Sequence, residues 1–568
     1  MKDFLFDPLL NMESYKNLLE DINDNKSPIF TYGLIDEDLG HFVYGLNQHL
    51  NKQILLITYD ETKSRRLYED IRNLGNANVE LFPKKEKLFY DIDASSFENL
   101  NQRLRAISKL LAGEKLILIA SLESLLDKFI DREIYEDYTK RIDFEGKVNL
   151  DDLVNNLVIA GYERVSMVEG IGQFSIRGGI IDIFSPNNQN PYRIELFDDE
   201  VDSIRTFDVI SQRSLEIINS VVIPPVKEVL ILDEYREIIY DNLKGELGSH
   251  KYQDKTIEKY ERYLELLQEE SYISNIHMIS PFIPDDYLGS LLDYLSKESL
   301  VFIDEPKRIE ERDNILKEEI YLKTTDLLEA GEILSAHISL DYEYKELLPK
   351  ILEKTVVISS TLLRASQNIQ GKSIYNFPVK STTNYHNKMN LLVEDINYYK
   401  YRGYKIIILS GTEERGIRLK ENLQEFEIES TFKSDRDGEI KSGQLFITTG
   451  SVRSGFEYSN IKLVIISDRE IFGVQKKKRK STKKKSGEKL INLSDLTVGS
   501  FVVHENHGIG QYEGIEQLDI QGIKKDYLTI RYKGHDKLYI PIDQMNLIQK
   551  YIGSDDAKPK INKLNSGD

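Results

Sequence analysis

Two carboxylates at the end of an apolar run come closest, by residue type and spacing, to catalytic chemistry. Asp304 and Glu305 close the run LVFIDEP at residues 300–306. Carboxylates directly after a buried strand can hold Mg²⁺ when a phosphate-binding loop lies opposite them. Such a loop has the pattern GxxxxGK[ST], because its backbone amides surround the phosphates and its lysine reaches the terminal ones. The chemistry at Asp304 therefore depends on whether the chain contains that loop.

The sequence does not provide a competent phosphate-binding loop. The loop would follow the first strand, at TYGLIDEDLG (residues 31–40), which contains no lysine and where Asp36, Glu37 and Asp38 would repel phosphate. The triplet GKS at residues 371–373 lacks the glycine that should stand five residues earlier. We therefore expect no catalytic residues in this chain, and neither ATP nor Mg²⁺ as a cofactor.

Two further pairs of residues could suggest chemistry but lack the partners that it needs. His504 and His507 lie in a glycine-rich turn, and two histidines without a third acidic or cysteine ligand are insufficient for a metal site. Arg453 and Arg469 could act as arginine fingers only beside a bound nucleotide. Without one, we interpret both arginines as surface ion-pair partners.

A strand with an unusual outer face is the best candidate for a binding site. In YRIELF (residues 192–197), period-2 alternation puts Tyr192, Ile194 and Leu196 on one face. If that face packs inward, Phe197 stands on a solvated face beside Arg193. An aromatic residue next to an arginine is typical of a protein-binding hot spot. The alternative is an incidental exposed phenylalanine, because much of any folded surface is apolar.

Composition excludes several classes of protein. The chain has 568 residues, 40% apolar content, no cysteine and a net charge of −20. This charge argues against a surface devoted to nucleic acid, since phosphate binding needs clustered Lys and Arg. The basic run KKKRKSTKKK at residues 476–485 reads as a solvated linker, with contact to nucleic acid as the alternative. No secretion signal and no run long enough to span a membrane is present, so we expect a soluble cytosolic protein without a membrane partner.

The order of apolar runs and turns predicts a multidomain α/β protein. Residues 28–130 alternate strand and helix patterns, which implies a mostly parallel sheet covered by helices. The short strands split by glycine-rich turns near the C-terminus predict a small antiparallel barrel of Tudor or SH3 type. Gly178-Gly179 predicts a bulge or a close backbone approach.

The expected domain boundaries are 1–138 (first part of a RecA-like sheet), 139–226 (inserted small α+β domain), 227–380 (the rest of that sheet), 388–472 (a further α/β domain), 473–490 (basic linker), 491–553 (barrel) and 554–568 (a terminal linker).

Two stretches carry a family resemblance. FSIRGGIIDIFSP (residues 174–186) and PYRIELFDDEVDSIRTFD (191–208) resemble the repair helicase UvrB and, more closely, the transcription-repair coupling factors of the Mfd family. In both, this segment is the domain that docks onto UvrA. The resemblance implies that Arg177, Arg193 and Phe197 contact UvrA. It also implies a degenerate RecA-like module without an ATP site, followed by a connector domain without chemistry of its own.

The second stretch is VVHENHGIGQYEGI (residues 502–515) with DKLYIPIDQMNLIQKYIG (536–553). It resembles the RNA-polymerase-interacting domain of the same family and the N-terminal domain of CarD-type regulators. In these proteins a strand edge pairs with the β subunit of RNA polymerase. The resemblance implies that Leu518, with Ile520 and Ile523 nearby, makes the apolar contact.

The order of modules points to the N-terminal part of a coupling factor acting as a scaffold that binds stalled RNA polymerase and recruits UvrA for nucleotide excision repair. In the whole family member, an ATP-dependent motor outside this sequence would translocate on DNA and displace polymerase. Two alternatives remain. A UvrB-like DNA-repair helicase predicts nucleotide binding, and a CarD-like transcription regulator predicts polymerase binding without UvrA.

Overall fold

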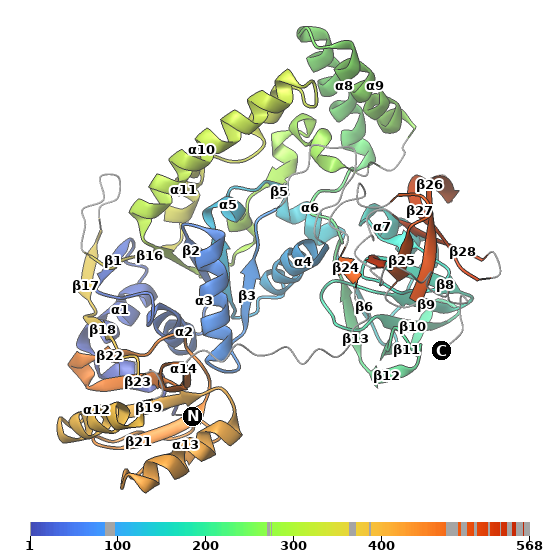
Figure 1. Cartoon of the computed structure of the whole chain (residues 1–568). Coiled ribbons are helices and arrows are strands. Elements are labelled where there is room, and N and C mark those ends of the chain that lie inside the picture. Colours follow the sequence, from blue (N-terminus) through green and yellow to red (C-terminus); the bar gives the residue numbers. More distant parts are fainter. Residues whose placement is uncertain are drawn as a thin grey trace.

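A computed structural model of the chain describes residues 2–85, 97–269, 275–362, 371–385, 388–472, 487–489, 497–504, 508–520, 523–533, 536–541 and 548–551, together with residues 273 and 561. The described part is an α/β protein with three large sheets of six or seven strands besides a C-terminal antiparallel one (Figure 1). The α/β class and the antiparallel C-terminal unit are as the sequence predicts. None of the helices in this part of the chain is both long and apolar enough to cross a membrane.

The first sheet has seven parallel strands, in the order β17-β1-β16-β15-β2-β4-β3. Its central strands are apolar runs buried on both faces, as expected for a parallel sheet covered by helices. Strand β1 lies between β17 and β16, and β15 lies beside β2, so strands from the first 121 residues and from residues 300–376 build one sheet. The strands are β1 (Ile29–Tyr32), β2 (Ile54–Thr58), β3 (Val79–Phe82), β4 (Ile117–Ser121), β15 (Leu300–Asp304), β16 (Thr355–Ser360) and β17 (Ser373–Asn376).

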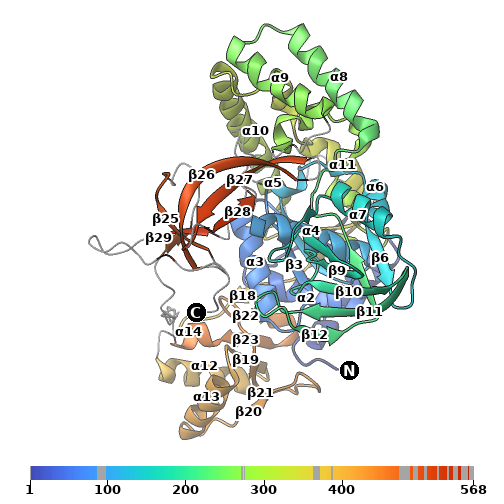
Figure 2. The ribbon, with the colours of Figure 1, turned by 90° about the vertical axis from the view of Figure 1, so that its right-hand side faces the viewer.

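Helices cover both faces of this sheet, and a helical pair, α8 with α9, projects from one end (Figure 2). A two-stranded bridge between β5 (Phe129–Ile130) and β14 (Leu288–Gly289) lies beside that pair. The helices are α1 (Glu13–Asn23), α2 (Leu39–Leu50), α3 (Glu61–Asn73), α4 (Phe97–Leu111), α5 (Leu122–Leu125), α6 (Arg132–Asp137), α8 (Asp233–Ser249), α9 (Asp254–Gln268), α10 (Pro306–Glu329) and α11 (Tyr344–Leu352).

Between β4 and β15 the chain forms a small domain with its own hydrophobic core, here called the inserted domain. A six-stranded sheet in the order β12-β11-β10-β9-β8-β7 packs against α7, and β6 pairs with β13 beside it. The elements are β6 (Lys140–Asp143), α7 (Leu150–Ile159), β7 (Glu163–Arg164), β8 (Gln173–Arg177), β9 (Ile180–Ile183), β10 (Tyr192–Phe197), β11 (Glu200–Phe207), β12 (Ser214–Ile217) and β13 (Ser220–Ile223).

A second α/β unit follows, with a six-stranded sheet in the order β18-β22-β23-β19-β21-β20. One face of this sheet packs on α12 and α13, whereas the other joins a core with the N-terminal segment and α2. Its elements are β18 (Val379–Ser381), α12 (Met389–Tyr401), β19 (Lys405–Ser410), α13 (Glu413–Glu425), β20 (Thr431–Lys433), β21 (Leu445–Thr449), β22 (Phe456–Tyr458), β23 (Leu463–Ser467) and α14 (Asp468–Phe472).

The core between the N-terminal segment and this unit was not predicted. The rings of Phe4 and Phe446 meet edge to face at 5.1 Å, and the Phe4 amide donates to the Arg436 carbonyl at 3.1 Å. In the same interface, the Tyr458 hydroxyl is hydrogen-bonded to the side chains of Asp38 and His41. Residues far apart in the sequence therefore share one buried core.

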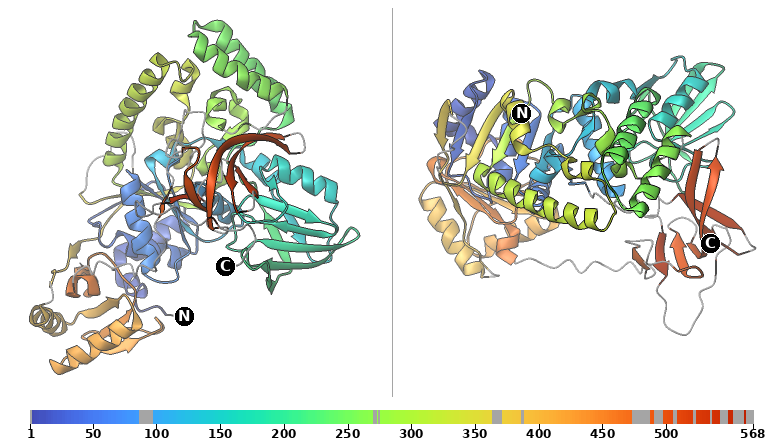
Figure 3. Two further views of the ribbon diagram at one scale, coloured as in Figure 1. Left: turned by 45° about the vertical axis from the view of Figure 1, so that its right-hand side comes forward. Right: turned by 90° about the horizontal axis from the view of Figure 1, so that it is seen from above.

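The C-terminal unit is a curled antiparallel sheet in the order β24-β29-β25-β26-β27-β28, here called the C-terminal sheet. It encloses a small apolar core and lies next to the inserted domain in each of the views (Figures 1 and 3). Its strands are β24 (Gly487–Lys489), β25 (Phe501–His504), β26 (Gly508–Ile520), β27 (Ile523–Arg531), β28 (Lys537–Pro541) and β29 (Ile548–Tyr551).

Candidate docking surfaces

Strand β10 presents the face that alternation predicts. Tyr192 and Ile194 are buried in the inserted domain's core, and Leu196 packs against that core. Phe197, at the end of the strand, has 81% of its surface exposed. An aromatic side chain with that exposure leaves a large apolar area in water, which a binding partner could bury. The predicted orientation of Phe197 is confirmed.

Arg193 lies on the same face but is engaged within the domain. Its Nε and Nη2 donate to the two carboxylate oxygens of Asp182 at 2.7 and 2.8 Å, and its Nη1 donates to the Gln212 carbonyl at 3.2 Å. The guanidinium also lies 4.4 Å from the ring centre of Phe207. The hydrogen bond to Asp182 raises the pKa of Arg193. Alternation identifies the face correctly, but it cannot show that residues 207–212 fold back over this end of the sheet.

Arg177 ends β8 on the exposed surface. Its Nε and Nη2 donate to the Ser166 carbonyl at 3.2 and 2.7 Å, which orients the guanidinium without neutralising it. The next residue, Gly178, has φ = +61°, and a Cβ on Gly179 would stand 2.7 Å from the Leu196 carbonyl oxygen. The two glycines therefore form the β8–β9 turn with a close backbone approach, one of the two predicted forms.

The inserted domain exposes apolar residues that the sequence analysis did not single out. They are Ile180 (39% exposed), Leu215 (53%), Ile217 (79%) and Ile210 (82%). Ile217 pairs with Arg205 across β11 and β12, so it lies on the same face of the sheet as Arg193. The sequence signal was the alternating segment SLEI at residues 214–217, in which leucine and isoleucine flank a glutamate. Phe197 is therefore one of several exposed apolar side chains in this domain.

The predicted polymerase contacts lie at the tip of the β26–β27 hairpin. Leu518 pairs with Lys525 and Ile520 with Ile523 in an antiparallel register. The backbone of these residues is described, whereas their side chains lie outside the description. His504 is buried in β25, and His507 lies outside the described residues. No group of three metal-ligating side chains occurs among the residues that the structure covers.

The segment after β17 packs closely against the loop that follows β1. A Cβ on Gly33 would stand 2.7 Å from the Phe377 carbonyl oxygen. Behind the loop, the Lys63 ammonium pairs with Asp36 and lies 3.6 Å from Asp304, the first of the two carboxylates after β15. Burial raises the pKa of Asp304 to about 6, with Lys63 opposing the shift. The acidic residues here are therefore balanced by a lysine of the chain itself.

Arg453 and Arg469 belong to the contact between the second α/β unit and α3. Arg453 Nη2 lies 3.9 Å from the Glu69 carboxylate. Burial raises the pKa of the neighbouring Asp70 to about 6, and the charges of Arg453 and Arg469 oppose that shift. Arg453 is thus an ion-pair partner, as expected.

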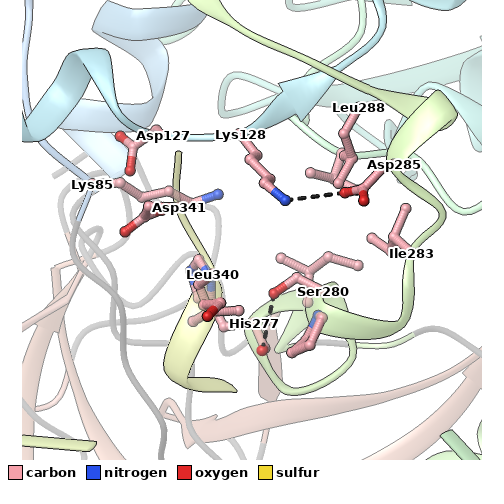
Figure 4. A pocket seen from close by; sticks show the side chains of 14 residues that line it. Lys85, Asp127, Lys128, His277, Ser280, Ile283, Asp285, Leu288, Leu340 and Asp341 are labelled. Atoms are coloured by element: carbon pink, nitrogen blue, oxygen red, sulfur yellow. Dashed lines mark hydrogen bonds and ion pairs between the residues drawn. The ribbon is translucent and has the colours of Figure 1, made fainter. Parts of the chain in front are cut away.

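A small cavity of about 60 Å³ lies near the exit of the inserted domain (Figure 4). Lys128 and Asp285 face each other across it, with Nζ and Oδ1 3.1 Å apart. The other lysine of its wall, Lys85, pairs with Glu228 at 3.2 Å. Since both cations are paired with carboxylates of the chain, we assign no ligand to this cavity.

Comparison with known proteins assigns two of these units. Residues 141–229 match the family model of the UvrB interaction domain, and residues 496–552 match that of the CarD-like/TRCF RID domain. Over 562 residues the chain is 33% identical to the transcription-repair-coupling factor of Bacillus subtilis, covering 97% of this chain and 47% of that protein.

This chain is similar, along nearly all its length, to part of a transcription-repair coupling factor. The coupling factor of Staphylococcus epidermidis is 33% identical over 525 residues, which cover 90% of this chain and 44% of that protein. The coupling factor of Staphylococcus haemolyticus gives the same identity over 524 residues. The chain thus spans less than half the length of these coupling factors. The first matched domain contains Arg177, Arg193 and Phe197, and the second contains Leu518, Ile520 and Ile523.

Proposed function

We propose that this chain is the docking scaffold of a transcription-repair coupling factor. The inserted domain binds UvrA, and the C-terminal sheet, as a CarD-like barrel, binds the β subunit of RNA polymerase. The observation that carries the proposal is the exposure of Phe197 at the open end of a sheet whose domain matches the UvrB interaction model. The seven-stranded sheet acts as a degenerate RecA-like body, and the second α/β unit connects it to the polymerase-binding module.

The UvrA site combines an apolar centre with oriented charge. Phe197 supplies the aromatic anchor, and Arg177 supplies a cation held by the Ser166 carbonyl but otherwise exposed. Arg193 contributes mainly by holding Asp182 and the Phe207 segment beneath the surface. Aromatic anchors with neighbouring arginines account for most of the binding energy in many interfaces.

Replacing Phe197 with alanine is expected to weaken UvrA binding by about 30-fold, corresponding to about 2 kcal/mol for loss of an aromatic hot spot. Biolayer interferometry with immobilised UvrA measures the dissociation constant. Phe426→Ala is the matched control, because Phe426 is 41% exposed but lies in the second α/β unit. Equal affinities for the wild type and Phe197→Ala would contradict the UvrA site.

Replacing Leu518 with glutamate is expected to lower affinity for a polymerase β-subunit fragment by at least about 10-fold, since a charge replaces an interfacial apolar residue. UvrA binding should not change. Val498→Glu is the control, because Val498 is 71% exposed in the same unit. Undiminished β-subunit binding by Leu518→Glu would reject this contact, whereas loss with both variants would indicate general damage to the C-terminal sheet.

We further propose that the chain does not bind nucleotide. The Lys63 ion pairs support this, because that cation is already paired with carboxylates of the chain, and the loop after β1 lacks the lysine that a phosphate would need. Millimolar Mg-ATP should leave the unfolding temperature unchanged, whereas a ligand at 100 times its dissociation constant would stabilise a protein by about 2.7 kcal/mol. A rise in the unfolding temperature that depends on ATP concentration would favour the helicase alternative.

A further inference from the structure

The C-terminal sheet contacts the inserted domain through Tyr527 in β27, and Tyr532, which follows that strand, is buried. The Tyr527 hydroxyl donates to Glu163 Oε1 at 2.9 Å. Tyr532 is 1% exposed, and its pKa is raised by burial and, to a smaller extent, by the carboxylate of Glu169. Glu163 lies in β7, and Glu169 lies in the turn after it. The Tyr527–Glu163 hydrogen bond is thus a direct contact between the two modules, and the charge of Glu169 acts on Tyr532 from the same region of the inserted domain.

The burial of Tyr527 indicates that this contact is packed. Leu528 and Ile530 belong to the core of the C-terminal sheet, so alternation places Tyr527 on the opposite face. Such a face of a small antiparallel sheet is normally open to water. Tyr527 is nevertheless only 4% exposed, and its hydroxyl is bound to Glu163. The inserted domain therefore contributes to the cover of this tyrosine.

This contact leaves the Phe197 face free. Glu163 lies in β7, at the edge of the six-stranded sheet, whereas Phe197 lies in β10. Three strand spacings separate them, roughly 14 Å at the usual distance between strands. Phe197 keeps 81% exposure with the C-terminal sheet in place.

We propose that the inserted domain and the C-terminal sheet form one rigid unit in solution, joined where the Tyr527 hydroxyl binds Glu163 and the two modules pack around it. The unit presents the Phe197 face and the C-terminal sheet at a fixed separation. A partner on one module is then held in a defined position relative to a partner on the other. The inference concerns the isolated chain and can be tested without either partner.

The absence of cysteine makes the test direct, because two engineered cysteines are the only labelling sites. Asp202→Cys in β11 and Asp536→Cys before β28 are both exposed and lie in the two modules. Nitroxide labels at these sites report the intermodule distance by pulsed electron paramagnetic resonance. The distance between the same pair of labels is measured in the double variant Glu163→Ala/Glu169→Ala. The matched control is Glu237→Ala/Asp241→Ala, which removes two exposed carboxylates of α8.

The wild type and the α8 control should give one narrow distance distribution, and Glu163→Ala/Glu169→Ala should give one at least roughly twice as wide, because the contact that holds the two modules is then lost. A second pair within the inserted domain, Asp202→Cys with Asn155→Cys, should stay narrow in all three proteins and so report that the domain is folded. A broad distribution in the wild type overturns the proposal. An unchanged narrow distribution in Glu163→Ala/Glu169→Ala, with the domain folded, also overturns it.

Discussion

Replacing Arg103 with methionine is expected to lower the free energy of unfolding by about 3–5 kcal/mol, the cost of removing one partner from a buried ion pair. Arg103 is 1% exposed and pairs with the carboxylates of Glu228 and Asp127, the latter at 2.8 Å. It also donates to the Pro83 carbonyl at 2.7 Å, and its guanidinium lies 4.2 Å from the ring centre of Phe82. Methionine occupies similar volume but leaves the two carboxylates without their buried guanidinium.

The position of Glu228 gives this network a wider role. Glu228 follows the exit of the inserted domain, and the Ile130 amide donates to its carbonyl at 3.0 Å. Tyr135 and Tyr162 donate to the carbonyls of Pro225 and Pro224 at 3.4 and 2.8 Å. Arg103 therefore fixes the segment by which the inserted domain is attached to the first sheet. Loss of Arg103 should therefore destabilise the attachment of the inserted domain before it destabilises the rest of the protein.

Denaturant unfolding followed by tyrosine fluorescence measures the effect. Arg105→Met, on the same helix, is the control. Its partner Glu80 keeps a second cation, Lys109, so the free energy of unfolding should change by less than about 1 kcal/mol. Arg103→Met/Glu228→Gln should recover part of the loss, because one of the two carboxylates that lose the guanidinium is then neutral. Equal unfolding midpoints for Arg103→Met and Arg105→Met would show that the buried ion pair is not important for stability.

Replacing Asp38 with asparagine is expected to stabilise the protein by about 2–4 kcal/mol at pH 8 and to have little effect near pH 4. Asp38 is fully buried, and burial raises its pKa to about 7. In the unfolded chain an aspartate ionises near pH 4, so the folded state holds a proton that the unfolded state loses between about pH 4 and 7. The stability contributed by this group is therefore complete below pH 4 and is lost as the pH rises through 7.

Asparagine reproduces the protonated form of Asp38. Its Oδ1 can accept from the Ile35 amide, as Asp38 does at 2.7 Å, and its Nδ2 can donate to the Tyr458 hydroxyl, now 3.0 Å from Asp38. The Tyr458 hydroxyl is then able to donate to Nδ1 of His41, 3.2 Å away. Burial lowers the pKa of His41 to about 4, so its imidazole is neutral at pH 8.

The measurement is the difference in unfolding free energy between Asp38→Asn and the wild type at pH 4.5, 6 and 8, which cancels the titration of all other groups. Asp241→Asn, on the exposed surface of α8, is the control and should show no trend. A difference that stays constant with pH would mean that Asp38 has an ordinary pKa in the folded protein.

The sequence was sufficient where local pattern determines structure. Apolar runs such as ILLIT and LVFID predicted buried parallel strands, and the alternation of YRIELF predicted that Phe197 is exposed. Glycine-rich turns between short strands predicted the antiparallel C-terminal unit. In each case, the residues that decide the outcome are within about ten positions of one another, so their periodicity carries the information.

The rest depended on contacts between distant segments. Arg193 pairs with Asp182 on one neighbouring strand, packs against Phe207 at the end of the other, and binds the carbonyl of Gln212 in the turn beyond it. Lys63 takes the role of counter-ion for Asp304, although it lies on a helix more than 200 residues earlier. The core that joins Phe4 to Phe446 has no local signature, because each residue alone looks like an ordinary apolar position. Such pairings follow from three-dimensional packing, which no single sequence window contains.

The packing of Phe4 on Phe446 also has a consequence for biosynthesis. The ribosome produces residues 4–9 long before residues 436–458, against which they are buried. At 5–20 residues per second, the early segment waits roughly 20–90 s for its partners. During that interval Phe4, Leu5 and Phe6 are exposed on the nascent chain, where chaperones that recognise short apolar stretches can bind them.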